Sequence, residues 1–265
     1  MGVSMDLELR GRRALITGGS RGIGFAAAEA LAAEGVAVGL VARNGKGLAA
    51  AAERLASHKA PVTTTAADVT DIGALNRAVD EIAAALGGLD LLVANAGGTV
   101  GSGNLKSAGP GDFTATFALN AGHAAELIRA GLPYLRDAGG GAVVIVSSIT
   151  GLRPAPRTAY AAAKAAEIQL AATAAQELAS DHIRVNAVSP GSIMFPGGSW
   201  ETFRQQNPED FATFLATQFP HGRLGRLREV GDVIAFLLSP RASWVTGSNV
   251  VVDGGQRYPS ARRFD

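Results

Sequence analysis

Short apolar runs alternate with alanine-rich segments of helical composition along nearly the whole chain. Each run ends at glycine, proline or polar residues after the few positions that a β-strand occupies. The runs are apolar at almost every position, which is typical of strands covered on both faces and therefore of a parallel sheet. The predicted strands are Arg13–Thr17, Val36–Ala42, Pro61–Ala66, Leu89–Ala94, Ala142–Ser147, Ile183–Val188 and Asn249–Val252. This alternation predicts an α/β fold, a doubly wound parallel β-sheet of about seven strands with helices on both faces.

The segments between these runs are predicted to be helices. Ile72–Leu86 is the clearest, because its apolar residues recur every three or four positions. The other predicted helices are Gly22–Glu34, Leu48–Ser57, Asp112–Leu135, Ala159–Leu178 and Val230–Leu238. A length of 265 residues without linker or repeat suits a single domain, so we expect one domain over residues 1–265.

The composition excludes several classes of function. The 24 basic and 23 acidic residues nearly cancel, which argues against a nucleic-acid partner. The chain has no cysteine, so thiol catalysis and cysteine-ligated metals are excluded, and its four histidines lie too far apart to suggest a metal site. No apolar run approaches the roughly 18 residues that span a bilayer, and the N-terminus does not resemble a secretory signal. We therefore expect no metal, no membrane association and a cytoplasmic location.

A glycine-rich turn, Thr17–Gly24 (TGGSRGIG), lies between the first predicted strand and the first helix. Glycine lets the backbone approach a ligand closely, and a helix start offers free N–H groups and the positive end of the helix dipole. A turn in this position binds the pyrophosphate in Rossmann-like dinucleotide folds, although the spacing here is G-x-x-x-G-x-G rather than G-x-G-x-x-G. The residues expected to contact the cofactor here are Gly18, Ser20, Arg21, Gly22, Ile23 and Gly24.

The end of the second predicted strand indicates which dinucleotide is bound. In NAD-binding folds an acidic residue at this place binds the ribose 2′-hydroxyl. No Asp or Glu occurs between Gly35 and Ala52, whereas Arg43 stands at the strand end and Arg21 lies within the glycine turn. Two cations without an acid suit a 2′-phosphate, so NADP is expected rather than NAD. The alternative is that Arg43 is only a solvated charge at the end of a strand.

Further motifs follow in a fixed order. They are ADV at Ala67–Val69, NAG at Asn95–Gly97, LN at Leu119–Asn120, SSITG at Ser147–Gly151, YAAAK at Tyr160–Lys164 and RVNAVSPG at Arg184–Gly191. With the glycine turn, they make the chain resemble the short-chain dehydrogenase/reductase family, in its compact single-domain branch, and in particular 3-oxoacyl-acyl-carrier-protein reductases. The resemblance runs from about Arg12 to Asp253.

The resemblance implies further contacts to the cofactor. Asp68 and Val69 would hold the adenine ring. Asn95 would brace the sheet beside the nucleotide, with Ala96 and Gly97 against it. The residues that would line the nicotinamide are Pro190, Gly191 and Ile193.

Tyr160 and Lys164 are predicted to carry the acid–base chemistry. They are four residues apart in a predicted helix and therefore share one face. A free tyrosine has a pKa near ~10 and is a poor proton donor and acceptor at neutral pH, but a nearby ammonium favours the phenolate. Tyr160 can then give a proton to a carbonyl oxygen or take one from an alcohol. By resemblance, Lys164 would also bind the nicotinamide ribose, and Asn120 would hold a water that connects Lys164 to solvent.

One hydroxyl of the pair Ser147 and Ser148 is expected to hold the substrate oxygen. A strand turns alternate side chains to opposite faces, so only one of them faces the site. Ser148 keeps the S-x-x-G pattern but lies 12 residues before Tyr160, one fewer than the resemblance leads us to expect, which Ser147 would satisfy. We predict that Ser148 is the catalytic serine and that the loop after Gly151 is one residue shorter.

A segment at about residues 192–226 is expected to form a lid over the substrate. By resemblance this region covers the active site, but Phe195 stands where the family often has a threonine. Six of the chain's aromatic residues lie here: Phe195, Trp200, Phe203, Phe211, Phe214 and Phe219. Either they contact an apolar substrate or close a dry lid, or they only pack the lid helices together.

The sequence thus predicts an oxidoreductase that transfers a hydride between NADP(H) and a carbonyl or secondary alcohol, reducing a small-molecule ketone or 3-oxoacyl-type substrate. Two alternatives are an NAD-dependent alcohol dehydrogenase of the same family and a non-catalytic NADP-binding regulator. By analogy with the family, we expect a homotetramer.

Overall fold

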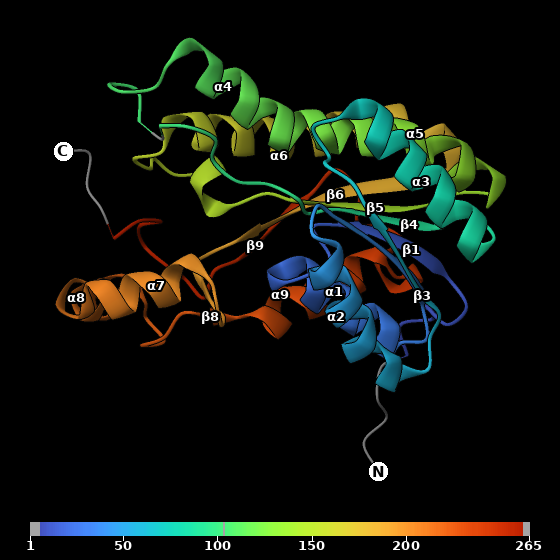
Figure 1. Ribbon diagram of the computed structural model, residues 1–265, viewed down its shortest axis with the longest axis horizontal. Helices are drawn as coiled ribbons and strands as arrows, with labels where there is room; N and C mark the ends of the chain where they lie inside the picture. Colours follow the sequence, from blue (N-terminus) through green and yellow to red (C-terminus); the bar gives the residue numbers. More distant parts are fainter. Residues whose placement is uncertain (1–5, 103, 262–265) are drawn as a thin grey trace.

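The computed structural model describes residues 6–102 and 104–261. At its centre lies a seven-stranded sheet in the order β3-β2-β1-β4-β5-β6-β9, in which every neighbouring pair is parallel (Figure 1). Its strands are β1 (Arg13–Thr17), β2 (Ala37–Ala42), β3 (Val62–Ala66), β4 (Leu91–Ala94), β5 (Gly141–Val146), β6 (Ile183–Pro190) and β9 (Asn249–Val252). A separate pair, β7 (Ile193–Met194) and β8 (Gly225–Arg226), lies beyond β6. The predicted doubly wound sheet is confirmed.

Helices cover both faces of the sheet (Figure 1). On one face lie α1 (Gly22–Ala33), α2 (Gly45–Leu55) and α9 (Leu227–Leu238). On the other lie α3 (Ile72–Leu86), α4 (Pro110–Phe117), α5 (His123–Asp137) and α6 (Thr158–Glu177). Two further helices, α7 (Ser199–Gln206) and α8 (Pro208–Gln218), project from the end of the sheet beside β7 and β8.

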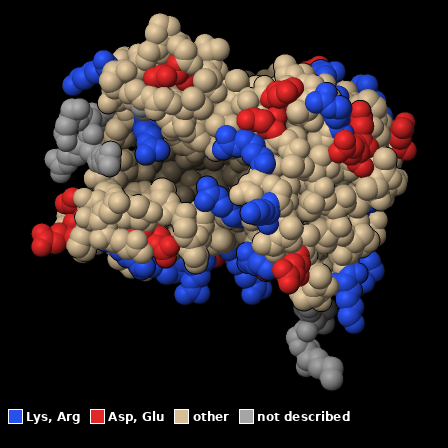
Figure 2. Space-filling view, viewed as in Figure 1, with Lys and Arg blue, Asp and Glu red and all other residues tan. Residues whose placement is uncertain are grey.

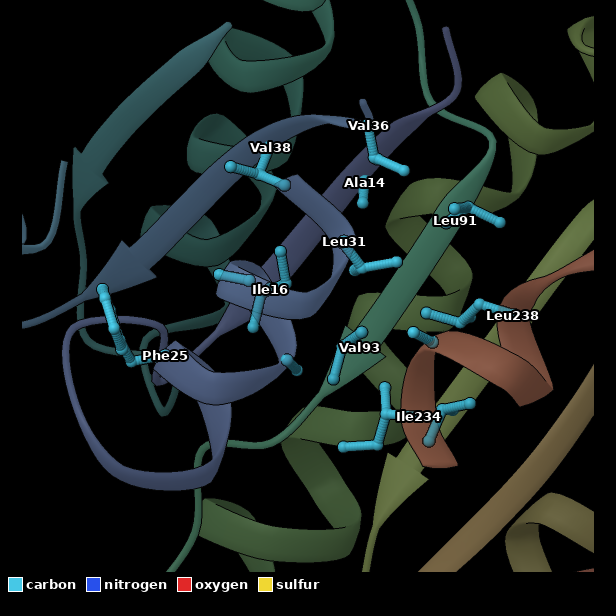
Figure 3. Packing of buried hydrophobic residues seen from close by; sticks show 14 of the residues in the cluster. Ala14, Ile16, Phe25, Leu31, Val36, Val38, Leu91, Val93, Ile234 and Leu238 are labelled. Carbon is cyan, nitrogen blue, oxygen red and sulfur yellow. The ribbon is translucent and has the colours of Figure 1, made fainter. Parts of the chain in front are cut away.

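The apolar strands supply two cores because their side chains alternate between the faces. In β1, Ala14 and Ile16 pack with α1 and α9, as Figure 3 shows, whereas Leu15 packs with α3 and α5. In β4, Leu91 and Val93 likewise belong to the first core (Figure 3). Burying one such aliphatic side chain contributes about 1.5–3 kcal/mol, so the two-sided burial is the main source of the sheet's stability.

The predicted helix Asp112–Leu135 is not one regular helix. The structure begins it at Pro110 and divides it into α4, a π-helical turn at Ala118–Gly122 and α5. Asn120 lies in that turn and its amide Nδ2 donates to the carbonyl of Thr116, 2.6 Å away. Since a π-turn inserts an extra residue into the helical ladder, it changes which side chains face the sheet. The helix is therefore broken where Asn120 contacts Gly98, in the segment that follows β4.

Strands β2 and β3 are added on one side of β1, and β4 and the later strands on the other side. Doubly wound folds bind ligands at such a point, which here lies between β1 and β4. Beside this point, Figure 2 shows a hollow between α4 and the pair α7 and α8, with Lys and Arg side chains around its rim. In the described ranges, no helix is long and apolar enough to cross a bilayer, and no group of three His, Asp or Glu side chains is placed to hold a metal.

Candidate active site

The glycine turn leads from β1 into α1. Gly18 and Gly22 have φ of +66° and +61°, a left-handed conformation that favours glycine. A Cβ atom on Gly24 would lie 2.4 Å from the carbonyl oxygen of Gly18, so the turn closes only with glycine there. No side chain caps the start of α1 and its first turn contains no acidic residue. Its N–H groups therefore remain for an anionic ligand.

Asn95 ties this turn to the end of β4. Its side-chain amide donates to the carbonyls of Thr17 and Gly18, at 3.0 and 3.3 Å. The hydroxyl of Thr17 in turn accepts from the backbone N–H groups of Asn95 and Ala96, at 3.0 and 3.2 Å. These bonds hold the two sides of the strand crossing together and set the shape of the turn.

The ring of Phe195 borders the same turn. A Cβ atom on Gly22 would lie 3.4 Å from Cζ of this ring, and Phe195 packs against the core that contains α1. Phe195 thus lies at the edge of the glycine turn rather than in the aromatic cluster of the α7–α8 region. The sequence placed Phe195 in the lid segment but did not reveal this contact.

Asp68 and Arg43 lie near the ends of β3 and β2. Oδ1 of Asp68 accepts from the N–H and the hydroxyl of Thr70, at 2.9 and 2.8 Å, and these bonds, with the positive charge of Arg43, lower the pKa of Asp68. Arg43 and Arg21 are exposed, and the guanidinium group of neither forms an ion pair or hydrogen bond with any residue that the structure describes. Both guanidinium groups are thus available to an anion.

Lys164 is buried on α6, with only 3% of its side chain exposed. Its Nζ donates to the carbonyl of Val146, at 2.9 Å, and lies 2.9 and 3.1 Å from the two carboxylate oxygens of Glu167. The same Nζ lies 5.5 Å from the ring centroid of Tyr160. Glu167 opposes the effect of burial, and the net result is a raised pKa for Lys164. The lysine is therefore a charged group beside Tyr160.

The backbone of Gly97 lies directly against the ammonium of Lys164 and the side chain of Asn120. A Cβ atom there would lie 3.1 Å from Nζ of Lys164 and 2.6 Å from Oδ1 of Asn120. The side chain of Asn120 is fully buried and bonds both backbone groups of Gly98: Oδ1 accepts from its N–H at 3.1 Å, and Nδ2 donates to its carbonyl at 2.7 Å. The π-turn thus brings Asn120 to the segment after β4.

His123 is buried beside Asn120 and Thr17, and both of its ring nitrogens form hydrogen bonds. Nδ1 lies 2.9 Å from the carbonyl of Asn120, which only accepts, so Nδ1 carries the proton. Nε2 then accepts from the hydroxyl of Thr17, 3.1 Å away. Burial and the charge of Lys164 lower the pKa of His123 to about 4. His123 is accordingly a neutral, structural residue at physiological pH.

The two serines after β5 have different surroundings. Ser147 is buried and its hydroxyl donates to the carbonyl of Lys164, at 2.7 Å. Ser148 is half-buried and its hydroxyl accepts from the N–H of Thr150, at 3.2 Å. Ser147 thus fastens α6 to the sheet, whereas the hydroxyl proton of Ser148 has no acceptor in the described part of the chain.

The end of β6 and the loop after it complete this edge. A Cβ atom on Gly191 would lie 2.7 Å from Oε1 of Gln256, and the same oxygen accepts from the N–H of Ser192, also at 2.7 Å. Pro190 is the last residue of β6, and Ile193, the first residue of β7, is 6% exposed. Val69, which follows β3, is equally buried. Gln256 therefore holds the loop that follows Pro190 close to the sheet.

Most aromatic residues after Phe195 pack with one another. The rings of Trp200 and Phe214 are stacked at 4.9 Å, with Phe203 and Phe219 edge-on to them. Phe211 packs against the same cluster. These contacts favour the interpretation that the rings hold α7 and α8 together.

Comparison with known proteins places this geometry in a family. The sequence model described as enoyl-(acyl carrier protein) reductase matches residues 18–257. The chain belongs to the short-chain dehydrogenase/reductase family. Members of this family are oxidoreductases, and the resemblance seen in the sequence is confirmed.

Three relatives illustrate the range of this family. The chain is 38% identical to cis-4-hydroxycyclohexanecarboxylate dehydrogenase of Sinomonas cyclohexanicum, covering 92% of this chain and 96% of the relative. It superimposes on 7α-hydroxysteroid dehydrogenase, solved with NADH, with a TM-score of 0.90, 29% identity, and coverage of 99% and 100%. It also matches a 3-oxoacyl (acyl-carrier-protein) reductase of Agrobacterium tumefaciens C58 with NADP bound, at a TM-score of 0.88, 33% identity, and coverage of 96% and 98%. Close relatives thus act on quite different molecules.

The structure brings Tyr160, Lys164, Asn120 and Gly97 together and places Ser148 after β5, on the edge where the strands end. The sequence reasoning missed Glu167, the partner of Lys164. An acid three residues after Lys164, in a helix otherwise rich in alanine, was the available signal.

Proposed function

We propose that this protein is an NADP(H)-dependent carbonyl reductase that acts through Tyr160, Lys164 and Ser148. The observation that supports this most is the charged, buried Lys164 between the ring of Tyr160 and the bare backbone of Gly97. This arrangement provides a proton-exchanging group beside a surface that a flat ligand can approach.

The residues present fit a nicotinamide dinucleotide. The glycine turn and the uncapped start of α1 would hold the pyrophosphate, and Asp68 with Val69 would hold the adenine. Lys164 would bind the nicotinamide ribose, with Ala96 and Gly97 on one side and Pro190, Gly191 and Ile193 on the other. When bound, the cofactor supplies or accepts the hydride.

The chain's own groups manage the proton and the substrate oxygen. Ser148 would donate its hydroxyl proton in a hydrogen bond to the substrate oxygen, since that proton has no acceptor among the described residues. Tyr160 would then give its proton to the same oxygen during reduction, or take one during oxidation. The ammonium of Lys164 favours the phenolate that remains after proton transfer. A positioned acid of this kind contributes about 10²–10⁴-fold in rate.

Arg43 would distinguish NADPH from NADH. Replacing Arg43 with alanine is expected to weaken NADPH binding by about tenfold to thirtyfold, the loss of one charge-assisted hydrogen bond, while NADH binding stays nearly constant. Calorimetric titration of each cofactor measures both constants. Arg54→Ala is the control, because Arg54 lies over the ring of Phe25 rather than at the strand ends. Equal weakening of both cofactors would refute the assignment of the 2′-phosphate to Arg43.

The substrate would enter beneath a lid formed by about residues 192–226, which includes α7 and α8. A panel of ketones, quinones and 3-oxoacyl thioesters, followed by the loss of NADPH or NADH absorbance, tests the proposal. Turnover of a carbonyl with NADPH would support it and identify the substrate class. Preferential oxidation of alcohols with NAD would favour a dehydrogenase, and NADPH binding without turnover of any compound would favour a regulator.

We propose further that the protein is a homotetramer in the cytoplasm. Trp244, Phe236 and Val251 expose large apolar surfaces on α9, on the edge strand β9 and between them, and 99% of Trp244 is exposed. Such surface at a free sheet edge suits a subunit contact. Light scattering coupled to size exclusion is expected to give four times the mass of the chain, and a stable monomer would contradict the assembly.

A further inference from the structure

Glu167 is a fully buried acid with no part in the chemistry described so far. It lies on α6, and 1% of its side chain is exposed. The other buried positions of this helix are Lys164 and the alanines Ala159, Ala163, Ala171, Ala174 and Ala175. An apolar residue at position 167 would continue this surface without the desolvation cost that a buried ion pair carries. The acid is therefore not required for packing.

The contacts of Glu167 are directed at Lys164. An ammonium has three N–H donors, and two of those of Lys164 go to the carbonyl of Val146 and to Oε1 of Glu167. One donor therefore remains for the open side of the lysine, where Tyr160 and Gly97 lie. Oε2 of Glu167 lies 2.9 Å from the same ammonium but has no aligned hydrogen-bond donor among the described residues.

The other titratable groups around this pair are few. Tyr160 on α6 and His123 on α5 interact with the charge of Lys164, and His123 is neutral above about pH 5 because of its low pKa. Asp112 of α4 caps its own helix, and Arg153, beyond the turn at Ile149–Gly151, pairs with Asp253. On β6, Arg184 donates to the backbone carbonyls of Leu237, Ser239 and Val245. Within the described residues, Glu167 is thus the negative charge that offsets Lys164.

We propose that Glu167 is a positioning residue of the active site. It holds the Lys164 ammonium in place and partly neutralises the positive charge that acts on Tyr160. Through this contact Glu167 sets the pH at which Tyr160 exchanges its proton. This inference rests on the proposed roles of Tyr160 and Lys164. Burial raises the pKa of Glu167 and is the larger effect, whereas Lys164 and the hydroxyl of Ser147 act in the opposite direction and favour the carboxylate.

The test is a titration of the phenolate of Tyr160 in cofactor-free protein. Phenolate absorbance is recorded against pH for the wild type and for Glu167→Gln, and the spectrum of the same protein carrying Tyr160→Phe is subtracted from each. As long as Lys164 stays protonated, the ammonium that Glu167→Gln leaves uncompensated favours the phenolate, so the midpoint is expected to fall by about one pH unit. The pH profile of kcat/KM for alcohol oxidation is expected to shift in the same direction by the same amount.

Further variants make the outcome decisive. Glu167→Leu removes the charge and continues the apolar surface, so it should shift the midpoint as Glu167→Gln does and replaces it if that variant does not fold. Glu167→Asp keeps the charge and should remain near the wild type, and Glu177→Gln, an exposed position on the same helix, should not shift it. A midpoint that is unchanged or raised in the folded neutral variants would overturn the proposal, even where turnover depends on Tyr160. Loss of the proposed function would instead appear as turnover that survives Tyr160→Phe.

Discussion

Replacing Tyr160 with phenylalanine is expected to lower turnover by about a thousandfold, the contribution of a positioned general acid. The substitution removes only the phenol hydroxyl, and the ring, whose centroid lies 5.5 Å from Nζ of Lys164, remains. Because the glycine turn, Arg43 and Lys164 are unchanged, the dissociation constant of NADPH should stay within about threefold of the wild type. Single-turnover kinetics with saturating NADPH separate the chemical step from binding.

Tyr134→Phe is the matched control for this variant. The hydroxyl of Tyr134 is exposed and donates to Asp80, at 2.7 Å, on α3 and away from Lys164. This substitution should leave turnover unchanged. Turnover of Tyr160→Phe within about tenfold of the wild type would exclude Tyr160 as the proton donor, since a water molecule rarely replaces a positioned acid so well.

Elements whose ends carry local signals were predicted to the residue. The helix Ile72–Leu86 begins after Asp71, whose side chain accepts from the N–H of Ala74 at 2.9 Å, and it ends at Gly87, which has φ of +76°. These are the common N-cap and C-cap residues of helices. The strands Arg13–Thr17 and Asn249–Val252 also end where predicted, because glycine or a charged residue bounds them.

The break in the predicted helix Asp112–Leu135 has no local signal of that kind. It depends on the contact of Asn120 with Gly98, which lies 22 residues earlier in the chain. Helical propensity marks an asparagine in a helix as unfavourable, but it does not specify that a π-turn will follow. The π-turn is thus determined by a tertiary contact, not by the local sequence.

The sequence predicted which residues belong to the active site, but not which side chains they contact. The spacing of Tyr160 and Lys164 placed them on one helical face, and the structure has them there. The partner of Lys164, by contrast, is determined by burial: Glu167 lies inside the protein only because α6 presses this face against β5 and β6. Likewise, the contact of Phe195 with Gly22 depends on how the chain returns after β6.

Ser148→Ala is expected to lower turnover by about a hundredfold or more, the usual effect of removing one hydrogen-bond donor to a developing oxyanion. Among the described residues, the hydroxyl of Ser148 accepts only from the N–H of Thr150, at 3.2 Å, so its own proton is available to a substrate oxygen. Since this contact would strengthen as charge develops on that oxygen, kcat should fall more than KM rises. Steady-state kinetics with the substrate found in the panel measure both constants.

Ser147→Ala separates this role from a structural one. The hydroxyl of Ser147 donates to the carbonyl of Lys164, so its removal deletes one buried hydrogen bond between the end of β5 and α6 and costs about 0.5–1.5 kcal/mol in the free energy of unfolding. The expected result is a lower thermal midpoint with turnover within a few-fold of the wild type, whereas Ser148→Ala should keep the midpoint and lose turnover. The reverse pattern would assign the substrate contact to Ser147, because the loop before Tyr160 would then have the longer spacing that the family resemblance suggests. Both variants differ from the wild type by one oxygen atom, so the comparison isolates the position of the hydroxyl.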